Sequence, residues 1–224
     1  MTACLQLDCN VMTDDVKSLR AARVADTEER ILAAARALFL RDGYPATTLA
    51  AVADAARVGH RTVYVRFGTK AALLKRVVDV AVAGDTRPVD VVSRDWFQTT
   101  LTAPTLEERI AASASGSASL MARAGDLIAI AEQAAPTEPD IAAAARAGRE
   151  GTRDAIRLFF TRLAEDGLLP AGTDVVWLAG TASLLSQAQT YLLARDTLGW
   201  TSDEYQQWLA TTLTRLISAA AGGN

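Results

Sequence analysis

The sequence predicts an all-α protein. Alanine is the commonest residue, the chain has only 6 prolines, and runs of β-branched residues long enough for a strand are scarce, so intrinsic propensity favours helix. Apolar residues also recur every three or four positions through most of the chain, which is the spacing of an amphipathic helix. We expect about nine helices.

The first predicted helix spans about residues 27–42. Asp26 and Glu29 have the spacing of a capping box, in which two side chains satisfy backbone N–H groups at the start of a helix. Apolar positions then recur at helical period until Gly43, where we expect the helix to end.

A short second helix follows. Either Thr47 or Thr48 can cap its first turn, and its apolar positions run to Ala56. The segment 57–59, Arg-Val-Gly, then interrupts the pattern and predicts a tight turn.

The third helix is also short, and the fourth is longer. Val63 and Phe67 lie four residues apart, so they share one face of the third helix. Gly68 ends that helix, and Thr69 can cap a fourth helix over residues 70–83.

Residues 84–104 are expected to form a loop or a weak helix, because proline, aspartate and serine surround the isolated pair Trp96-Phe97. Prolines and glycines then mark the ends of the remaining helices. The five predicted helices are 105–123, 126–135, 138–166, 174–195 and 202–221.

Composition excludes several classes of protein. No run approaches the roughly 18 apolar residues of a membrane span, and the acidic first residues do not suit a secretory signal, so we expect a cytoplasmic protein. Cys4 and Cys9 are too few and too local for a disulfide framework; they pair, chelate or have no role. His60 is the single histidine, which argues against a metal, a cofactor or an enzyme.

The charge is divided unevenly along the chain. Residues 1–84 carry 12 Lys+Arg and 9 Asp+Glu, a net charge of +3, whereas residues 85–224 carry 11 and 17, a net charge of −6. The segment 55–76 contains no acid, and such a segment in an acidic protein indicates a site for a polyanion, although an ordinary solvated face is the alternative. Its basic residues are Arg57, Arg61, Arg66, Lys70, Lys75 and Arg76.

Two short helices joined by a tight turn, the second of them basic, predict a helix-turn-helix. The second helix of this motif enters the major groove of DNA. With Val63 and Phe67 facing inward, the polar side chains of that helix are left for base edges and phosphates. Lys70, in the first turn of the next helix, is well placed for a phosphate.

Residues 27–75 resemble the DNA-binding domain of the TetR family of transcriptional regulators. The matching positions are Gly43, Tyr44, Thr47, Thr48, Ala53, Ala56, Val58, Thr62, Tyr64, Phe67, Lys70, Leu73 and Leu74, together with the pattern of the first helix. The resemblance implies that Thr48, Thr62, Tyr64 and Lys70 contact the DNA backbone and that residues near His60 and Arg61 read sequence. The predicted DNA-binding residues are Thr48, Arg57, Gly59, His60, Arg61, Thr62, Tyr64, Arg66 and Lys70.

Three residues depart from the family pattern. Arg57 replaces the usual turn glycine, so its backbone either stays out of the left-handed region or accepts modest strain. Gly59 replaces a capping serine. Arg61 replaces a glycine and adds a long cation to the third helix.

The acidic half cannot favour DNA, so we expect it to dimerise, bind a ligand, or both. Apolar stripes on the helices from residues 174 and 202 predict a dimer interface, with the core of the subunit as the alternative. The predicted interface residues are Leu184, Tyr191, Tyr205, Trp208, Thr212 and Leu216.

A pocket among these helices would take a small hydrophobic or amphipathic effector, because pockets between helices are mostly apolar. The alternative is that its aromatic residues are ordinary core. The candidate pocket residues are Trp96, Phe97, Met121, Phe159, Trp177 and Gln187.

Together these features predict three parts: an extension over residues 1–25, a helix-turn-helix domain over 26–75 and a helical effector-binding and dimerisation domain over 76–224. Arg20 and Arg23 in the extension either form a minor-groove arm or belong to a flexible segment with no role. The functional hypothesis is a homodimeric repressor released from a pseudo-palindromic operator in double-stranded DNA by a small-molecule effector. The alternative is a ligandless regulator or an activator whose second half only dimerises or binds a protein partner.

Overall fold

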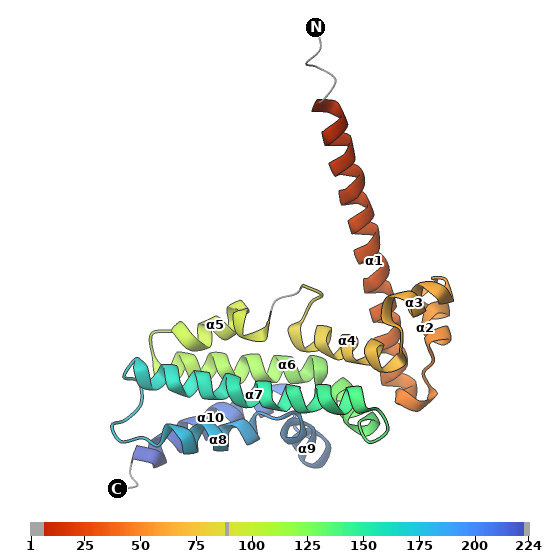
Figure 1. Ribbon diagram of the computed structural model, residues 1–224. Helices are drawn as coiled ribbons and strands as arrows, with labels where there is room; N and C mark the ends of the chain where they lie inside the picture. The colour runs from red at the N-terminus through yellow and green to blue at the C-terminus, as the bar shows by residue number, and fades with distance from the viewer. Residues whose placement is uncertain (1–6, 88–89, 222–224) are drawn as a thin grey trace. The chain divides into compact units, whose positions relative to one another are not determined.

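The computed structural model describes residues 7–87 and 90–221, with side chains over 22–87 and 90–220. This part of the chain forms ten α-helices and one 3-10 helix and contains no strand (Figure 1), which confirms the all-α prediction. The α-helices are α1 (Leu7–Ala46), α2 (Leu49–Ala56), α3 (His60–Phe67), α4 (Lys70–Ala83), α5 (Asp95–Thr102), α6 (Leu106–Ala134), α7 (Pro139–Glu165), α8 (Val175–Leu185), α9 (Ala188–Leu198) and α10 (Ser202–Ala221), with the 3-10 helix η1 (Val91–Ser93) before α5.

The chain divides into two compact units, and the boundary falls inside α4, after Leu74. In the N-terminal unit, α1 packs on α2 and α2 on α3. Its core is built from apolar side chains of α1, α2, α3 and the start of α4. The fully buried ones include Ile31, Ala35, Phe39, Val52, Ala53, Val63, Leu73 and Leu74.

The first helix is longer than predicted. It begins at Leu7 rather than near residue 27, so Asp26 lies inside the helix and pairs with Arg30 one turn later, at 3.9 Å. The capping box was therefore a wrong prediction, because no glycine or proline interrupts the chain before Gly43. Gly43, with φ 74°, ends the regular part of α1 as expected. Cys4 and the side chains of Cys9 and Arg20 lie outside the described residues.

In the C-terminal unit, α6 is one continuous helix where two were predicted. It starts with the capping box of Thr105 and Glu108. Gly125 does not break it; instead the missing side chain leaves room for Tyr191 of α9, whose ring carbons would lie 3.4 Å from a Cβ at this position. Gly125 therefore serves the packing of two helices rather than a turn.

The opposite correction applies to the predicted helix 174–195, which is divided into α8 and α9 at Ser186 and Gln187. Side chains bind the carbonyl groups at the end of α8. The Thr190 hydroxyl donates to Leu184 O at 2.8 Å, and the Tyr205 hydroxyl donates to Leu185 O at 2.9 Å. These hydrogen bonds replace the backbone hydrogen bonds that the carbonyl groups lack where α8 ends.

The core of the C-terminal unit contains aromatic residues from three helices, with Phe159 and Phe160 on α7 and Tyr191 edge-on to Tyr205 at 5.1 Å. Burial raises the pKa of the Tyr205 phenol. Residues 84–104, expected to be loop or weak helix, contain η1 and α5. No helix among the described residues has the length and apolar character needed to cross a bilayer.

Candidate nucleic-acid interface

The turn between α2 and α3 is a tight Schellman-type turn. The Val58 N–H donates to Ala53 O at 3.0 Å and the Arg57 N–H to Asp54 O at 3.1 Å. This geometry places Arg57 in the left-handed region, with φ 54° and ψ 48°, where it is the one non-glycine residue with positive φ in the described chain. Of the two alternatives for Arg57, the strained backbone is the one adopted.

A residue that sequence reasoning missed holds this turn in place. The guanidinium of Arg30, on α1, donates to the carbonyl oxygens of Ala56 at 2.6 Å and Arg57 at 3.0 Å. These carbonyls end α2 and have no helical partner, so a cation there satisfies both hydrogen bonding and the helix dipole. Arg30 thereby fixes α2 relative to α1.

The third helix shows its polar side to solvent. Val63 is its one fully buried side chain, whereas Arg61, Thr62, Tyr64 and Val65 are all exposed. Tyr64 is 66% and Val65 71% exposed. Gly59 precedes the first residue of the helix as its N-cap, and no side chain caps the first turn.

Two of the predicted DNA-binding side chains are engaged inside the N-terminal unit. Arg66 pairs with Glu28 of α1, and its Nε lies 3.2 Å from a Glu28 carboxylate oxygen. His60 Nε2 lies 2.8 Å from the Asp54 carboxylate of α2, and both of these side chains remain mostly exposed. The two contacts hold α3 against its neighbours, and Glu28 offsets the charge of Arg66, which is part of the basic charge of residues 55–76.

Lys70 is fixed at the start of α4. Its ammonium group donates to Tyr44 O at 2.7 Å and to Pro45 O at 3.4 Å, and it lies 4.1 Å from the centre of the Tyr44 ring. An ammonium group has three donors, so one N–H remains for a phosphate. The Thr48 hydroxyl accepts from the Ala51 N–H at 3.1 Å, which confirms it over the buried Thr47 as the cap of α2.

The predicted site residues therefore fall into two groups. The first group is exposed: it consists of Thr48 at the start of α2 and of Arg57, Gly59, Arg61, Thr62 and Tyr64 around the turn and α3. His60, Arg66 and Lys70 are placed by Asp54, Glu28 and Tyr44. Arg30 and Glu28 gave no sequence signal, because they lie 26 to 38 residues from the groups they bind.

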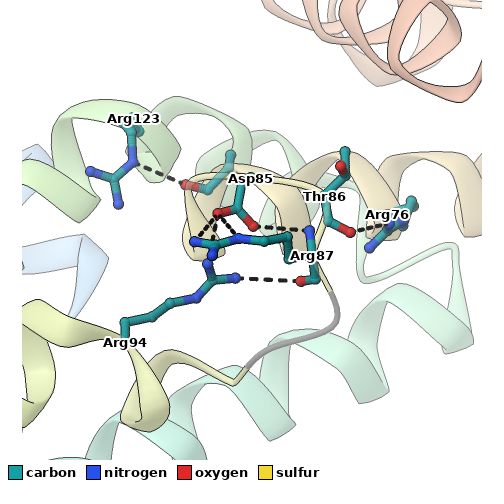
Figure 2. A network of polar contacts seen from close by, with 7 residues as sticks. Arg76, Asp85, Thr86, Arg87, Arg94 and Arg123 are labelled. Carbon is teal, nitrogen blue, oxygen red and sulfur yellow. Dashed lines mark hydrogen bonds and ion pairs between the residues drawn. The ribbon is translucent and has the colours of Figure 1, made fainter. Parts of the chain in front are cut away.

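A network of arginines surrounds the end of α4 in the C-terminal unit (Figure 2). Asp85 accepts hydrogen bonds from Arg94 at 2.7 Å and Arg87 at 2.8 Å, and these two cations hold the pKa of its carboxyl group far below the usual range. Arg76 donates to Thr86 O at 3.3 Å, and Arg123 of α6 donates to Ala81 O of α4 at 3.4 Å. The network ties the last turn of α4 to the helices that follow.

The structure does not bring the six predicted pocket residues together. Met121 and Phe159 are core residues, Trp177 is half-exposed on α8, and Gln187 is the residue before α9. Trp96 lines a cavity of about 340 Å³, and Phe97 is buried with its ring edge-on to that of Trp96. The cavity lies between α5 and α6, with Thr99, Ala112, Gly116, Ser119 and Arg123 among its other lining residues.

The six predicted dimer residues also separate. Tyr191 and Tyr205 are 6% and 1% exposed, so they belong to the subunit core and leave no surface for a partner. Leu184 is 68% exposed. Trp208, Thr212 and Leu216 form one partly exposed row on α10 at four-residue spacing.

Comparison with known families decides the identity of the N-terminal unit. Residues 31–77 match the model of bacterial regulatory proteins, tetR family. The chain carries the DNA-binding domain of the TetR family. The matched residues contain the helix-turn-helix of α2 and α3 and the first half of α4, as the sequence predicted.

Solved structures share the fold over most of the chain. NalD, the secondary repressor of the MexAB-OprM multidrug efflux pump in Pseudomonas aeruginosa, is 21% identical with a TM-score of 0.65, covering 88% of this chain and 98% of NalD. FadR from Bacillus subtilis, solved with stearoyl-CoA, is 16% identical with a TM-score of 0.65 over 85% and 97% of the chains. A Mesorhizobium loti protein assigned to the TetR-family regulators is 20% identical with a TM-score of 0.67 over 88% and 98%. These likenesses show a TetR-like fold for both units.

No curated protein matches the sequence. Among the described residues, no group of three or more His, Cys, Asp or Glu side chains is placed to hold a metal ion.

The strained turn gives a first prediction. Replacing Arg57 with glycine should stabilise the protein by about 1 kcal/mol, because glycine adopts the left-handed conformation without the clash of a Cβ atom. Urea unfolding at fixed protein concentration measures the change as a higher midpoint. The matched control is Arg57→Ala, which removes the same side chain but keeps the Cβ. Equal midpoints for the glycine and alanine variants would contradict backbone strain at this position.

Proposed function

We propose that this protein is a homodimeric, sequence-specific DNA-binding repressor that a small effector releases from a pseudo-palindromic operator. The observation that carries the proposal is the outward face of α3, where Arg61, Thr62 and Tyr64 are exposed while Val63 is buried. Side chains of these types bind base edges and phosphates in the major groove. Lys70 and the hydroxyl groups of Thr48, Thr62 and Tyr64 hold the DNA backbone, and Arg57 and Gly59 lie at the turn beside it.

Dimerisation is supported by the composition of α8. This helix contains no charged residue and buries Leu178, Ala179 and Ala182 on one side. On its other side Val176 is 81%, Leu184 68% and Trp177 50% exposed. A helix that is apolar all round is stable when both faces are covered. In the proposed dimer, a second copy of the chain covers the exposed side of α8. It also covers the row of Trp208, Thr212 and Leu216 on α10.

Release by an effector is supported by Arg123, which lines the cavity between α5 and α6 and also donates to Ala81 O near the end of α4. A small amphipathic molecule that binds Trp96 and Arg123 would compete for that contact. Because residues of α4 belong to both units, a shift of this helix changes the spacing of two recognition helices in a dimer. An effector that binds one arrangement of the protein more tightly than the other by a few kcal/mol is enough to shift the protein between them.

The DNA-binding proposal predicts that random duplex DNA selected on the purified protein yields a pseudo-palindromic sequence. Tyr64→Phe should weaken binding of that sequence about 30-fold, because the dimer loses two hydrogen bonds to phosphate of about 1 kcal/mol each. Fluorescence anisotropy measures the affinity, and sedimentation velocity checks that the dimer is intact. An unchanged affinity would remove the Tyr64 hydroxyl from the interface, and no enrichment of any sequence would contradict the proposed function.

The dimer proposal makes a separate prediction with a matched pair of leucines. Leu184 on α8 and Leu193 on α9 are almost equally exposed, at 68% and 66%. Leu184→Glu should convert the protein to a monomer, because two carboxylates would face each other in an apolar interface. Leu193→Glu should leave the dimer intact. Sedimentation velocity distinguishes the two states, and a Leu184→Glu variant that dimerises like the wild type would place the interface elsewhere.

A further inference from the structure

Val65 is an exposed apolar side chain at the centre of α3. Val65 is 71% exposed, more than any other large apolar side chain described in the N-terminal unit. It lies in the middle of a basic helix, two residues after the buried Val63. A β-branched residue also lowers helix propensity, so neither the stability of α3 nor the core of the unit gains from valine at this position.

Val65 lies on the same face of α3 as Arg61, the cation of this helix that is available for DNA. Arg61 precedes Val65 by four residues, so the two side chains are neighbours on one face of the helix. No hydrogen bond or ion pair joins the Arg61 side chain to the rest of the described protein. Arg66, by contrast, is held by Glu28 of α1. An arginine and an exposed apolar group thus stand side by side on the outward surface.

The major-groove edges of the bases offer a matching pair of groups. Guanine presents O6 and N7, which an arginine binds with two hydrogen bonds, and the thymine 5-methyl is the one apolar group in the groove. Four residues of an α-helix span about 6 Å along its axis, and successive bases of a DNA strand are about 3.4 Å apart. Arg61 and Val65, four residues apart, therefore reach bases that are separated by about two base steps.

We propose that Arg61 and Val65 read a guanine and the 5-methyl group of a thymine, about two base steps apart, in each half-site of the operator. The inference rests on the DNA-binding function proposed above and names the bases that the site prefers. Arg61 replaces the glycine expected from the family pattern, so the readout belongs to this chain's own residues. Tyr64, the other exposed residue of the helix centre, carries a hydroxyl and is assigned to phosphate instead.

The test uses the full-length protein and the duplex enriched by selection. Each thymine of a half-site is replaced in turn by deoxyuridine, which lacks only the methyl group, and each guanine by 7-deazaguanine, which lacks N7. Replacement of one of these thymines should lower the affinity of the wild type about fourfold, which is the contribution that burial of one methyl group makes to binding. Val65→Ala, which shortens the apolar side chain, should lose most of the difference in affinity between the thymine and uracil duplexes. The affinity of Arg61→Ala should be unchanged by 7-deazaguanine at one position.

Val24→Ala, at an exposed valine of α1 in the same unit, is the matched control and should keep the wild-type pattern. Thermal unfolding checks that the variants remain folded. Specific binding that no thymine replacement changes, or a Val65→Ala protein that distinguishes thymine from uracil as strongly as the wild type, overturns the readout and leaves the DNA-binding function standing. Failure to enrich any duplex overturns both.

Discussion

The structure depends on how an eight-residue helix is held in place. A helix as short as α3 is unstable alone in water, and Val63 is the one side chain that it buries completely. The remaining restraint comes from polar contacts with other elements: Arg66 binds Glu28 on α1, His60 contacts Asp54 on α2, and Arg30 holds the turn before the helix. These contacts keep the outward face of α3 in one orientation before DNA arrives, which lowers the entropic cost of binding.

The same contacts decide which charges face DNA. The acid-free segment 55–76 indicates a strong positive surface, but Glu28 lies outside that segment and offsets the charge of Arg66 within it. Arg57 and Arg61 remain exposed, and Lys70 keeps one donor beyond its two carbonyl partners. The positive charge available to DNA is therefore smaller and more localised than the sequence alone indicates, and it is concentrated around the turn and α3.

Much of the fold could be predicted from the sequence, because capping residues, glycines and apolar spacing are local signals. The ends of α2, α3, α4, α7 and α10 follow from them. Two helix boundaries were predicted wrongly because they depend on contacts between distant parts of the chain. The α6 helix continues through Gly125, which makes room for Tyr191. The α8 helix ends where its carbonyl groups accept hydrogen bonds from Thr190 and Tyr205. The exposed residues of the DNA-binding site were predictable from the motif, whereas Glu28, Arg30 and Tyr44 were not, since each acts across more than 20 residues of chain. The pocket and dimer residues were harder still, because an apolar stripe does not distinguish core from interface.

The central claim is that a small set of cations around α3 binds the DNA backbone of two half-sites. The dependence of DNA affinity on salt concentration tests it most directly, because each neutralised phosphate contributes a slope of about −0.9 to log affinity against log salt. With Arg57 and Lys70 neutralising phosphates in both half-sites, the expected slope is about −4. A slope shallower than about −1 would mean that these cations do not meet phosphates, and it would contradict the account.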